Sequence, residues 1–130
     1  MGRISVEEII QRRRARREQV INSAKKWASK LKGPITAILV GSYARGDFNV
    51  WSDVDIVIVS PLFEKQTPLE RLSRVDSPPG YEVIPWTPRE LKDMISNQNP
   101  IAVEIIKHGI ILRDDIGIEE KINKLKKKPS

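Results

Sequence analysis

The chain has 130 residues, 39% of them hydrophobic and 31% charged, which fits one compact domain and leaves no room for a second full core. It has no cysteine and one histidine, His108, which excludes structural disulfides, thiolate nucleophiles and cysteine-bearing zinc sites and disfavours a Ser-His-Asp relay. The formal net charge of +6 suits a polyanionic partner such as a nucleotide or nucleic acid, although a solvated basic surface explains it equally well.

The first residues carry no recognisable export signal. Met1 to Arg17 becomes polar and arginine-rich where a signal peptide needs its apolar stretch. No apolar run in the chain approaches the roughly 20 residues that a membrane-spanning helix requires. We therefore expect a cytoplasmic protein that has no membrane partner.

Residues 1–33 are predicted to form an N-terminal helix. Ser5 and Glu8 have the spacing of a capping box, and Gly33-Pro34 is a stop signal. Apolar residues recur at three- and four-residue steps in the second half, which indicates one buried face. The first half is expected to bend away from the core or to project from it, because it carries Arg12, Arg13, Arg14, Arg16 and Arg17. We expect these arginines to form a solvated helix face, with contact to a partner or a nucleic acid as the alternative.

Three strands are predicted in the middle of the chain. Residues 35–40 and 53–59 are short apolar runs rich in branched side chains, which is typical of buried strands, and residues 81–86 form the third strand. Between the second and third strands, Thr67 is followed three residues later by Glu70, a capping pattern that predicts a small helix.

The last part of the chain is predicted to be mostly helical. A capping box at Thr87 and an Asn-Pro pair at residues 99–100 each predict the start of a helix. Residues 110–112 are expected to add a short last strand. Residues 115–128 are expected to form an amphipathic helix with a lysine-rich end that frays.

The predicted order of elements is α-β-β-α-β-α-α-β-α, which gives an α/β or α+β fold with helices packed on a small mixed sheet. No internal repeat is present. We interpret the chain as a single domain, 1–130, with three parts: the N-terminal helix over 1–33, a core over 35–112, and a C-terminal helix with a basic tail over 115–130.

Asp53 and Asp55 stand at the start of the second predicted strand. Side chains alternate along a strand, so the two carboxylates are expected to point the same way, about 7 Å apart. Two ionised carboxylates at about 6 Å repel each other by roughly 3 kcal/mol at an effective dielectric constant of about 20. A divalent cation relieves such repulsion, and ligands that are all oxygen favour Mg²⁺ or Mn²⁺.

Gly41 and Ser42 end the first predicted strand and complement the two acids. A glycine lets the backbone approach a ligand closely, and the following amides and the Ser42 hydroxyl can donate hydrogen bonds to phosphate oxygens. Arg45 either adds a positive charge beside those phosphates or braces the turn. Carboxylates for a metal next to amides for phosphate predict a site for a metal–nucleotide complex. Two metal ions held in this way would clamp the attacking and the leaving oxygen.

A third carboxylate is needed to hold a second metal ion and to accept the proton of the acceptor. The candidates after Asp55 are Glu64, Glu70, Asp76 and Glu82. Only Glu82 lies in a predicted strand, so only it would project from the sheet beside the aspartates. We assign the metal-binding and catalytic roles to Asp53, Asp55 and Glu82, and nucleotide binding to Gly41, Ser42 and Arg45.

This pattern resembles the DNA-polymerase-β-type nucleotidyltransferase superfamily, and in particular its minimal nucleotidyltransferase domains. The superfamily pattern is Gly-Ser, ten residues, then Asp-x-Asp, and the matching residues are Gly41, Ser42, Asp53 and Asp55. Residues 42–46 also match the common S-x-A-R-G form, and residues 82–88 are similar to the strand that carries the third carboxylate. The resemblance covers residues 35–112 and implies a nucleotidyltransferase fold.

The resemblance also implies the roles of the matching residues. Asp53 and Asp55 would bind both metal ions, which would be Mg²⁺ with Mn²⁺ as the alternative, and Glu82 would complete one of the two sites. Gly41 and Ser42 would hold the triphosphate of ATP. The sequence departs from the family at Glu82, where aspartate is more usual.

Minimal members of this superfamily often pair with a HEPN-domain toxin, and as antitoxins they adenylylate one of its tyrosines. The resemblance therefore implies transfer of AMP from ATP to a HEPN partner. Transfer to a small molecule such as an aminoglycoside, or a catalytically idle module that neutralises a partner by contact, are the alternatives. With 130 residues there is little surface for an acceptor pocket, so we expect another polypeptide or a second copy to complete it.

The aromatic residues and the histidine give weaker signals. Trp27, Trp51 and Trp86 are expected to pack in the core or at its rim, with stacking on a base as the alternative. His108 precedes Gly109 and is expected to end a helix without any role in chemistry.

Overall fold

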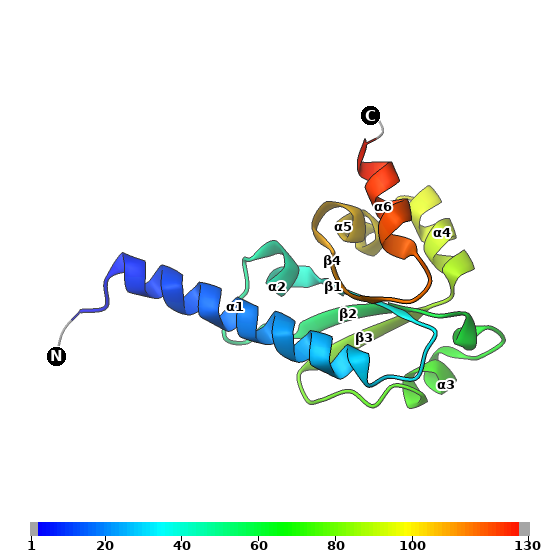
Figure 1. Cartoon of the computed structure of the whole chain (residues 1–130), viewed down its shortest axis with the longest axis horizontal. Coiled ribbons are helices and arrows are strands. Elements are labelled where there is room, and N and C mark those ends of the chain that lie inside the picture. Colours follow the sequence, from blue (N-terminus) through cyan, green and yellow to red (C-terminus); the bar gives the residue numbers. More distant parts are fainter. Residues whose placement is uncertain (1–2, 128–130) are drawn as a thin grey trace.

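The computed structural model describes residues 3–127 and contains the strands β1 Thr36–Val40, β2 Val54–Val59, β3 Tyr81–Trp86 and β4 Ile110–Asp114. They form one sheet in the order β3-β2-β1-β4 (Figure 1). β1 runs antiparallel to both of its neighbours, whereas β2 and β3 are parallel. The predicted small mixed sheet is therefore confirmed, and its third strand has the predicted bounds.

Helices flank this sheet within the described part of the chain. They are α1 Val6–Ser29, α2 Gly41–Arg45, the 3-10 helix η1 Pro61–Phe63, α3 Pro68–Ser73, α4 Pro88–Ser96, α5 Pro100–His108 and α6 Ile118–Lys127. The order of elements confirms the predicted one and adds α2 and η1. Residues 1, 2 and 128–130, which include the predicted end of the last helix, lie outside the described residues. Among residues 3–127, no helix combines the length and the apolar character needed to cross a bilayer.

Short-range sequence signals set the helix ends. Thr67 and Thr87 each accept a hydrogen bond from the backbone N–H three residues later, and the glutamate at that position returns the bond to the threonine N–H. The Ser5 hydroxyl accepts a hydrogen bond from the N–H of Glu8 at 3.1 Å. These bonds satisfy N–H groups that have no partner inside the helix. The helix starts predicted at all three positions are confirmed.

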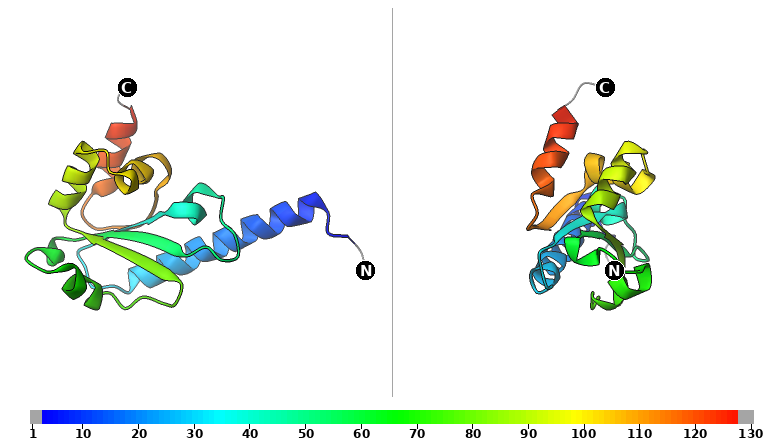
Figure 2. Two further views of the ribbon diagram at one scale, coloured as in Figure 1. Left: turned by 180° about the vertical axis from the view of Figure 1, so that it is seen from behind. Right: turned by 90° about the vertical axis from the view of Figure 1, so that its right-hand side faces the viewer.

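Each face of the sheet is covered by helices (Figures 1 and 2). On one face, the second half of α1 packs through Val20, Ala24 and Ala28 against buried strand residues such as Ile56. On the other face, α4, α5 and α6 enclose a second buried cluster. Its members are Ile38, Val40, Val57, Val59, Trp86, Leu91, Ile105, Ile118 and Ile122. Alternate residues of the central strands thus enter opposite cores, which explains why both strands read as continuous apolar runs.

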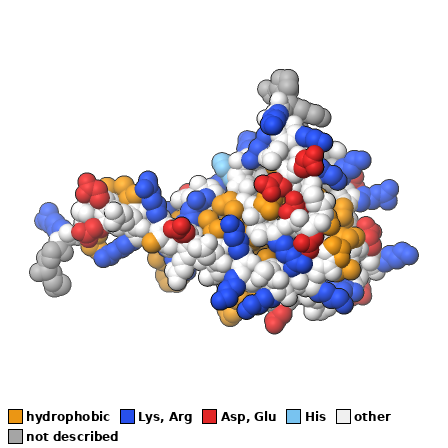
Figure 3. Space-filling view, in the orientation of Figure 1, with side chains coloured by type: hydrophobic (Ala, Val, Ile, Leu, Met, Phe, Trp, Pro, Cys, Tyr) orange, Lys and Arg blue, Asp and Glu red, His pale blue; other side chains and the backbone are white. Residues whose placement is uncertain are grey.

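The first half of α1 extends away from the sheet, as predicted (Figures 1 and 2). Its large hydrophobic side chains are exposed, with Val6 at 71%, Ile9 at 47% and Ile10 at 44%. The space-filling view shows acidic, basic and hydrophobic side chains side by side along this projection (Figure 3).

Two arginines of α1 bind the segment that follows β1. Arg17 donates hydrogen bonds to the carbonyl oxygens of Tyr43 and Ala44, both at 2.7 Å. Arg13 donates to the carbonyl oxygens of Gly46 at 3.1 Å and Phe48 at 2.9 Å, and its guanidinium lies 4.4 Å from the centre of the Phe48 ring. The expectation of a solvated face is therefore wrong for Arg17, which is half-buried, whereas Arg13 is exposed but also binds the protein. Both tie α1 to the C-terminal end of α2, where carbonyl groups attract positive charge.

We expect Arg17→Ala to lower the free energy of unfolding by about 1–3 kcal/mol, because two carbonyl groups lose charge-assisted hydrogen bonds. Arg12→Ala is the matched control, since Arg12 is exposed on the same helix. Urea denaturation of the wild type and both variants measures the effect. Equal stability of the two variants would show that the Arg17 bonds do not support the fold.

Candidate active site

Two of the predicted acids lie side by side on neighbouring strands. Asp55 of β2 is paired in register with Glu82 of β3, and the two strands are parallel. By alternation, Asp55 is on the same face as Val57 and Val59, which is the face covered by α4, α5 and α6. The sequence predicted that Glu82 lies in a strand and projects beside the aspartates. The register of β2 and β3 confirms this position beside Asp55.

Asp53 lies just outside β2, because the strand begins at Val54 and not at residue 53 as predicted. The side chains of Asp53 and Glu82 are exposed, and that of Asp55 is half-buried. As the side chains lie, no three His, Cys, Asp or Glu residues between 3 and 127 form a group that could hold a metal ion. Of the three carboxylates that were expected to converge, Asp55 and Glu82 are paired across the strands, and Asp53 does not complete a set of three with them.

Burial and neighbouring carboxylates raise the pKa of Asp55 to about 6. Burial has the largest effect, followed by the charge of Glu82 and a hydrogen bond shared with it. The charges of Asp53 and Glu104 raise the pKa further. Three other carboxylates therefore act on Asp55, and a cation would relieve this repulsion. The ligands available are all carboxylate oxygens, which Mg²⁺ and Mn²⁺ prefer, so the kind of ligand fits such an ion, while the described side chains do not form its site as they lie.

The turn between β1 and α2 brings the backbone against these acids. The last residue of β1, Val40, is paired with Asp55 across the sheet, and Gly41 follows it with a φ of +76°. A Cβ atom added to Gly41 would overlap the carboxylate of Asp55. Only glycine therefore fits both the backbone conformation and the space. Ser42, the second residue of α2, is half-buried beside this close approach.

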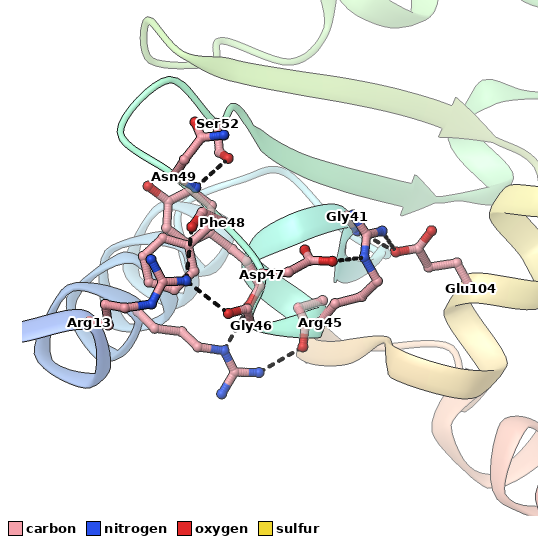
Figure 4. A network of polar contacts seen from close by, with 12 residues as sticks. Arg13, Gly41, Arg45, Gly46, Asp47, Phe48, Asn49, Ser52 and Glu104 are labelled. Carbon is pink, nitrogen blue, oxygen red and sulfur yellow. Dashed lines mark hydrogen bonds and ion pairs between the residues drawn. The ribbon is translucent and has the colours of Figure 1, made fainter. Parts of the chain in front are cut away.

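A further acid, Glu104 of α5, binds the same turn (Figure 4). Its Oε1 atom accepts a hydrogen bond from the N–H of Gly41 at 3.1 Å. The same oxygen forms an ion pair with Nη1 of Arg45. The Nε group of Arg45 donates to Asp47 at 3.1 Å. Of the two roles considered for Arg45, the structure shows the bracing one.

Glu104 was missed by the sequence analysis. A signal was present, because Glu104 is the one charged residue in the apolar run of residues 101–106. A charge in such a run is expected to have a partner. Its partners, Gly41 and Arg45, are 63 and 59 residues away in the chain, and residue spacing does not reveal contacts at that separation.

The tryptophans fall into two groups. Trp27 is partly buried and meets the ring of Tyr81 edge-on, with 5.2 Å between ring centres, and Trp86 is 8% exposed. Packing was predicted for both and is confirmed. It is wrong for Trp51, which is 88% exposed beside Val50 at 89%. These two residues form the tip of the loop that leads from α2 to Asp53.

Comparison with known proteins identifies a family model and two solved structures. A model described as a nucleotidyltransferase domain matches residues 20–129. The fold is similar to that of a Sulfolobus solfataricus protein described as a nucleotidyltransferase, with a TM-score of 0.52 and 20% identity over 85% of this chain and 89% of that one. It is also similar to a chain of a toxin–antitoxin complex with AMP-PNP, with a TM-score of 0.52 and 16% identity over 82% of each chain. No curated protein sequence matches.

Proposed function

This chain belongs to the nucleotidyltransferase domain family, and from that premise we propose that it transfers AMP from ATP to an acceptor hydroxyl. The observation that carries the proposal is the pairing of Asp55 with Glu82 directly beside the close approach of Gly41. Carboxylates that repel one another attract a cation, and a glycine turn admits the phosphates that such a cation bridges.

Each residue of the site has a role in this proposal. Asp53, Asp55 and Glu82 would hold two Mg²⁺ ions, or Mn²⁺, which neutralise charge on the reacting phosphate. Asp53 is exposed and would turn toward the pair to take part. Ser42 would donate its hydroxyl and amide to the triphosphate, and Gly41 leaves the space for it. Arg45 would offer the phosphates Nη2, the one nitrogen that Asp47 and Glu104 do not bind.

The transfer itself is an in-line displacement at the α-phosphorus. The acceptor oxygen forms a bond to this phosphorus while the bond to the bridging oxygen breaks, and pyrophosphate leaves. The proton of the acceptor hydroxyl passes to a carboxylate. Glu82 is the candidate base, because it is exposed at the edge of the acidic pair, where an acceptor can reach it.

We propose that the acceptor is a protein, a tyrosine of a HEPN-type toxin, for which this chain acts as the antitoxin. Three observations support this choice over a small molecule. Asp53 and Glu82 are exposed, so an acceptor as large as another polypeptide can reach them. The loop that leads to Asp53 presents Val50 and Trp51 to solvent, which is typical of a surface that meets another polypeptide. The fold is also similar to a chain of a toxin–antitoxin complex with AMP-PNP.

Incubation with labelled ATP, Mg²⁺ and candidate acceptors tests the proposal. We expect label transfer by the wild type and none by Asp53→Ala/Asp55→Ala. Transfer to an aminoglycoside alone would identify a small-molecule enzyme, and transfer to a second copy would make the chain its own acceptor. A tight complex with unlabelled, inhibited toxin would contradict transfer and identify a module that acts by contact.

We expect Trp51→Ala to reduce transfer to a protein acceptor by about tenfold while the affinity for Mg·AMP-PNP stays unchanged. The reason is that an exposed aromatic residue at an interface often contributes about 1–2 kcal/mol. Leu69→Ala is the matched control, because Leu69 is also exposed, at 78%, but lies on α3. Steady-state transfer and calorimetry measure the two quantities. Unchanged transfer by the Trp51 variant would remove this loop from the acceptor surface.

A further inference from the structure

Resting on the proposed function, we propose that Glu104 is a positioning residue that holds the phosphate-binding turn and Arg45 in their active arrangement. One oxygen of this carboxylate binds donors from both ends of α2, because Gly41 is the first residue of that helix and Arg45 the last (Figure 4). The helix has 5 residues, which is too short to hold its own geometry. Glu104 supplies the support from outside.

The position of α5 gives this support a firm base. Its residues Ala102 and Ile105 have no exposed surface, and α5 packs against β1, the strand that leads into the turn. Glu104 is next to Ile105 in α5, so its backbone is held in place by the core. The Nε group of Arg45 also donates a hydrogen bond to Asp47, which is exposed.

The choice of an acid at this position is unfavourable for the neighbouring acids. Glu104 binds Gly41, the residue that lies against the Asp55 carboxylate, so it adds a negative charge beside the acids. A neutral side chain would avoid this repulsion, but it would lose the ion pair with Arg45. The ion pair with Arg45 is thus present despite the charge repulsion between Glu104 and the neighbouring acids. This is consistent with a role in placing Arg45 for the triphosphate.

The length of the side chain and its charge can be tested separately. Glu104→Gln keeps the reach and an acceptor oxygen but loses the charge that pairs with Arg45, so we expect the affinity for Mg·AMP-PNP to fall by about threefold. Glu104→Asp keeps the charge but is one carbon shorter and cannot span both donors. We expect it to lose about tenfold, as Glu104→Ala does. Asp93→Ala on α4 is the control for the change in net charge, since Asp93 is exposed.

A double-mutant cycle tests whether Glu104 acts through Arg45. We expect Arg45→Ala to weaken Mg·AMP-PNP binding by about tenfold, and Arg45→Ala/Glu104→Ala to weaken it no further. Calorimetric titration measures the affinities, and thermal unfolding confirms that each variant is folded. If Glu104→Ala does not fold, the cycle is run with Glu104→Asp.

The outcomes separate this inference from the proposed function. A wild type that binds no Mg·AMP-PNP would contradict the proposed function and this role with it. A wild type that binds, together with Glu104→Asp and Glu104→Ala variants that bind as well or more tightly, would overturn the role of Glu104 alone. Losses from Arg45 and Glu104 that simply add would overturn it too, because Glu104 would then act independently.

Discussion

Asp55→Asn is expected to abolish transfer and, at neutral pH, to make the fold more stable. The loss of transfer should be at least about a thousandfold, because Asp55 is the acid that faces both Glu82 and the Gly41 turn. The gain in stability follows from its electrostatics. Asparagine has nearly the same shape and brings no charge into the cluster.

The direction of the pH effect follows from the raised pKa. Asp55 has a pKa of about 6 in the folded chain, against its ordinary pKa of 3.8, which we take for the unfolded chain. Below pH 3.8 the residue is protonated in both states, so it does not alter the free energy of unfolding. Between pH 3.8 and about 6 the unfolded chain releases the proton first, and stability is lost as the pH rises through the folded pKa. Because Asp55 is half-buried and partly screened by solvent, we expect a loss of about 1–2 kcal/mol.

Urea denaturation at pH 4 and pH 8 measures this difference. We expect Asp55→Asn to be more stable than the wild type at pH 8, and the two to converge at pH 4. Mg²⁺ should stabilise the wild type at pH 8 and have little effect on the variant. Asp93→Asn is the control, because Asp93 is exposed on α4. A variant that is no more stable than the wild type at pH 8 would contradict the repulsion.

Gly41→Ala is expected to lower both the stability of the fold and the affinity for nucleotide. The φ of +76° costs a residue with a Cβ about 1–2 kcal/mol, and the new atom would also overlap the Asp55 carboxylate. Because that carboxylate has Glu82 on its other side, it cannot move away without bringing the two acids closer. We expect the free energy of unfolding to fall by about 2–4 kcal/mol and the affinity for Mg·AMP-PNP to fall by at least about a hundredfold.

The chain offers a matched control for this substitution. Gly117 has a φ of +75°, and a Cβ atom added there would meet nothing within 4 Å. Gly117→Ala therefore measures the backbone strain alone, and the difference between the variants measures the clash at the site. Denaturation and calorimetry of both provide the comparison. If Gly41→Ala and Gly117→Ala destabilised the fold equally and Gly41→Ala still bound Mg·AMP-PNP, the close approach of Gly41 to Asp55 would not matter for stability or for binding.

Much of the fold could be predicted because its signals are local. The capping residues Thr67 and Thr87 act on an N–H three residues away, and β3 is bounded by a Pro-Gly turn and by Thr87. Glu82 could be placed in the third strand by the same logic, since lying in a strand was the property that separated it from the other acids. The pairing of β2 with β3 then places Glu82 beside Asp55, on the same face of the sheet.

The features that were missed depend on contacts between distant segments. In the sequence, Arg13 and Arg17 cannot be distinguished from the other arginines of the run. They bind carbonyl groups 26 to 35 residues away, and the spacing of residues does not predict contacts at that separation. Trp51 was expected to pack because tryptophan usually does, and its exposure results from its place at a loop tip. The start of β2 was predicted one residue early because the apolar run gives no signal for where the sheet pairing begins.

A crystal structure with Mn²⁺ and AMP-PNP, with the manganese located by its anomalous scattering, tests the central claim most directly. We predict manganese bound by Asp53, Asp55 and Glu82, with Asp53 turned toward the other two, and the triphosphate on Gly41 and Ser42. Manganese and nucleotide bound elsewhere, with Asp55 and Glu82 binding neither, would contradict the account.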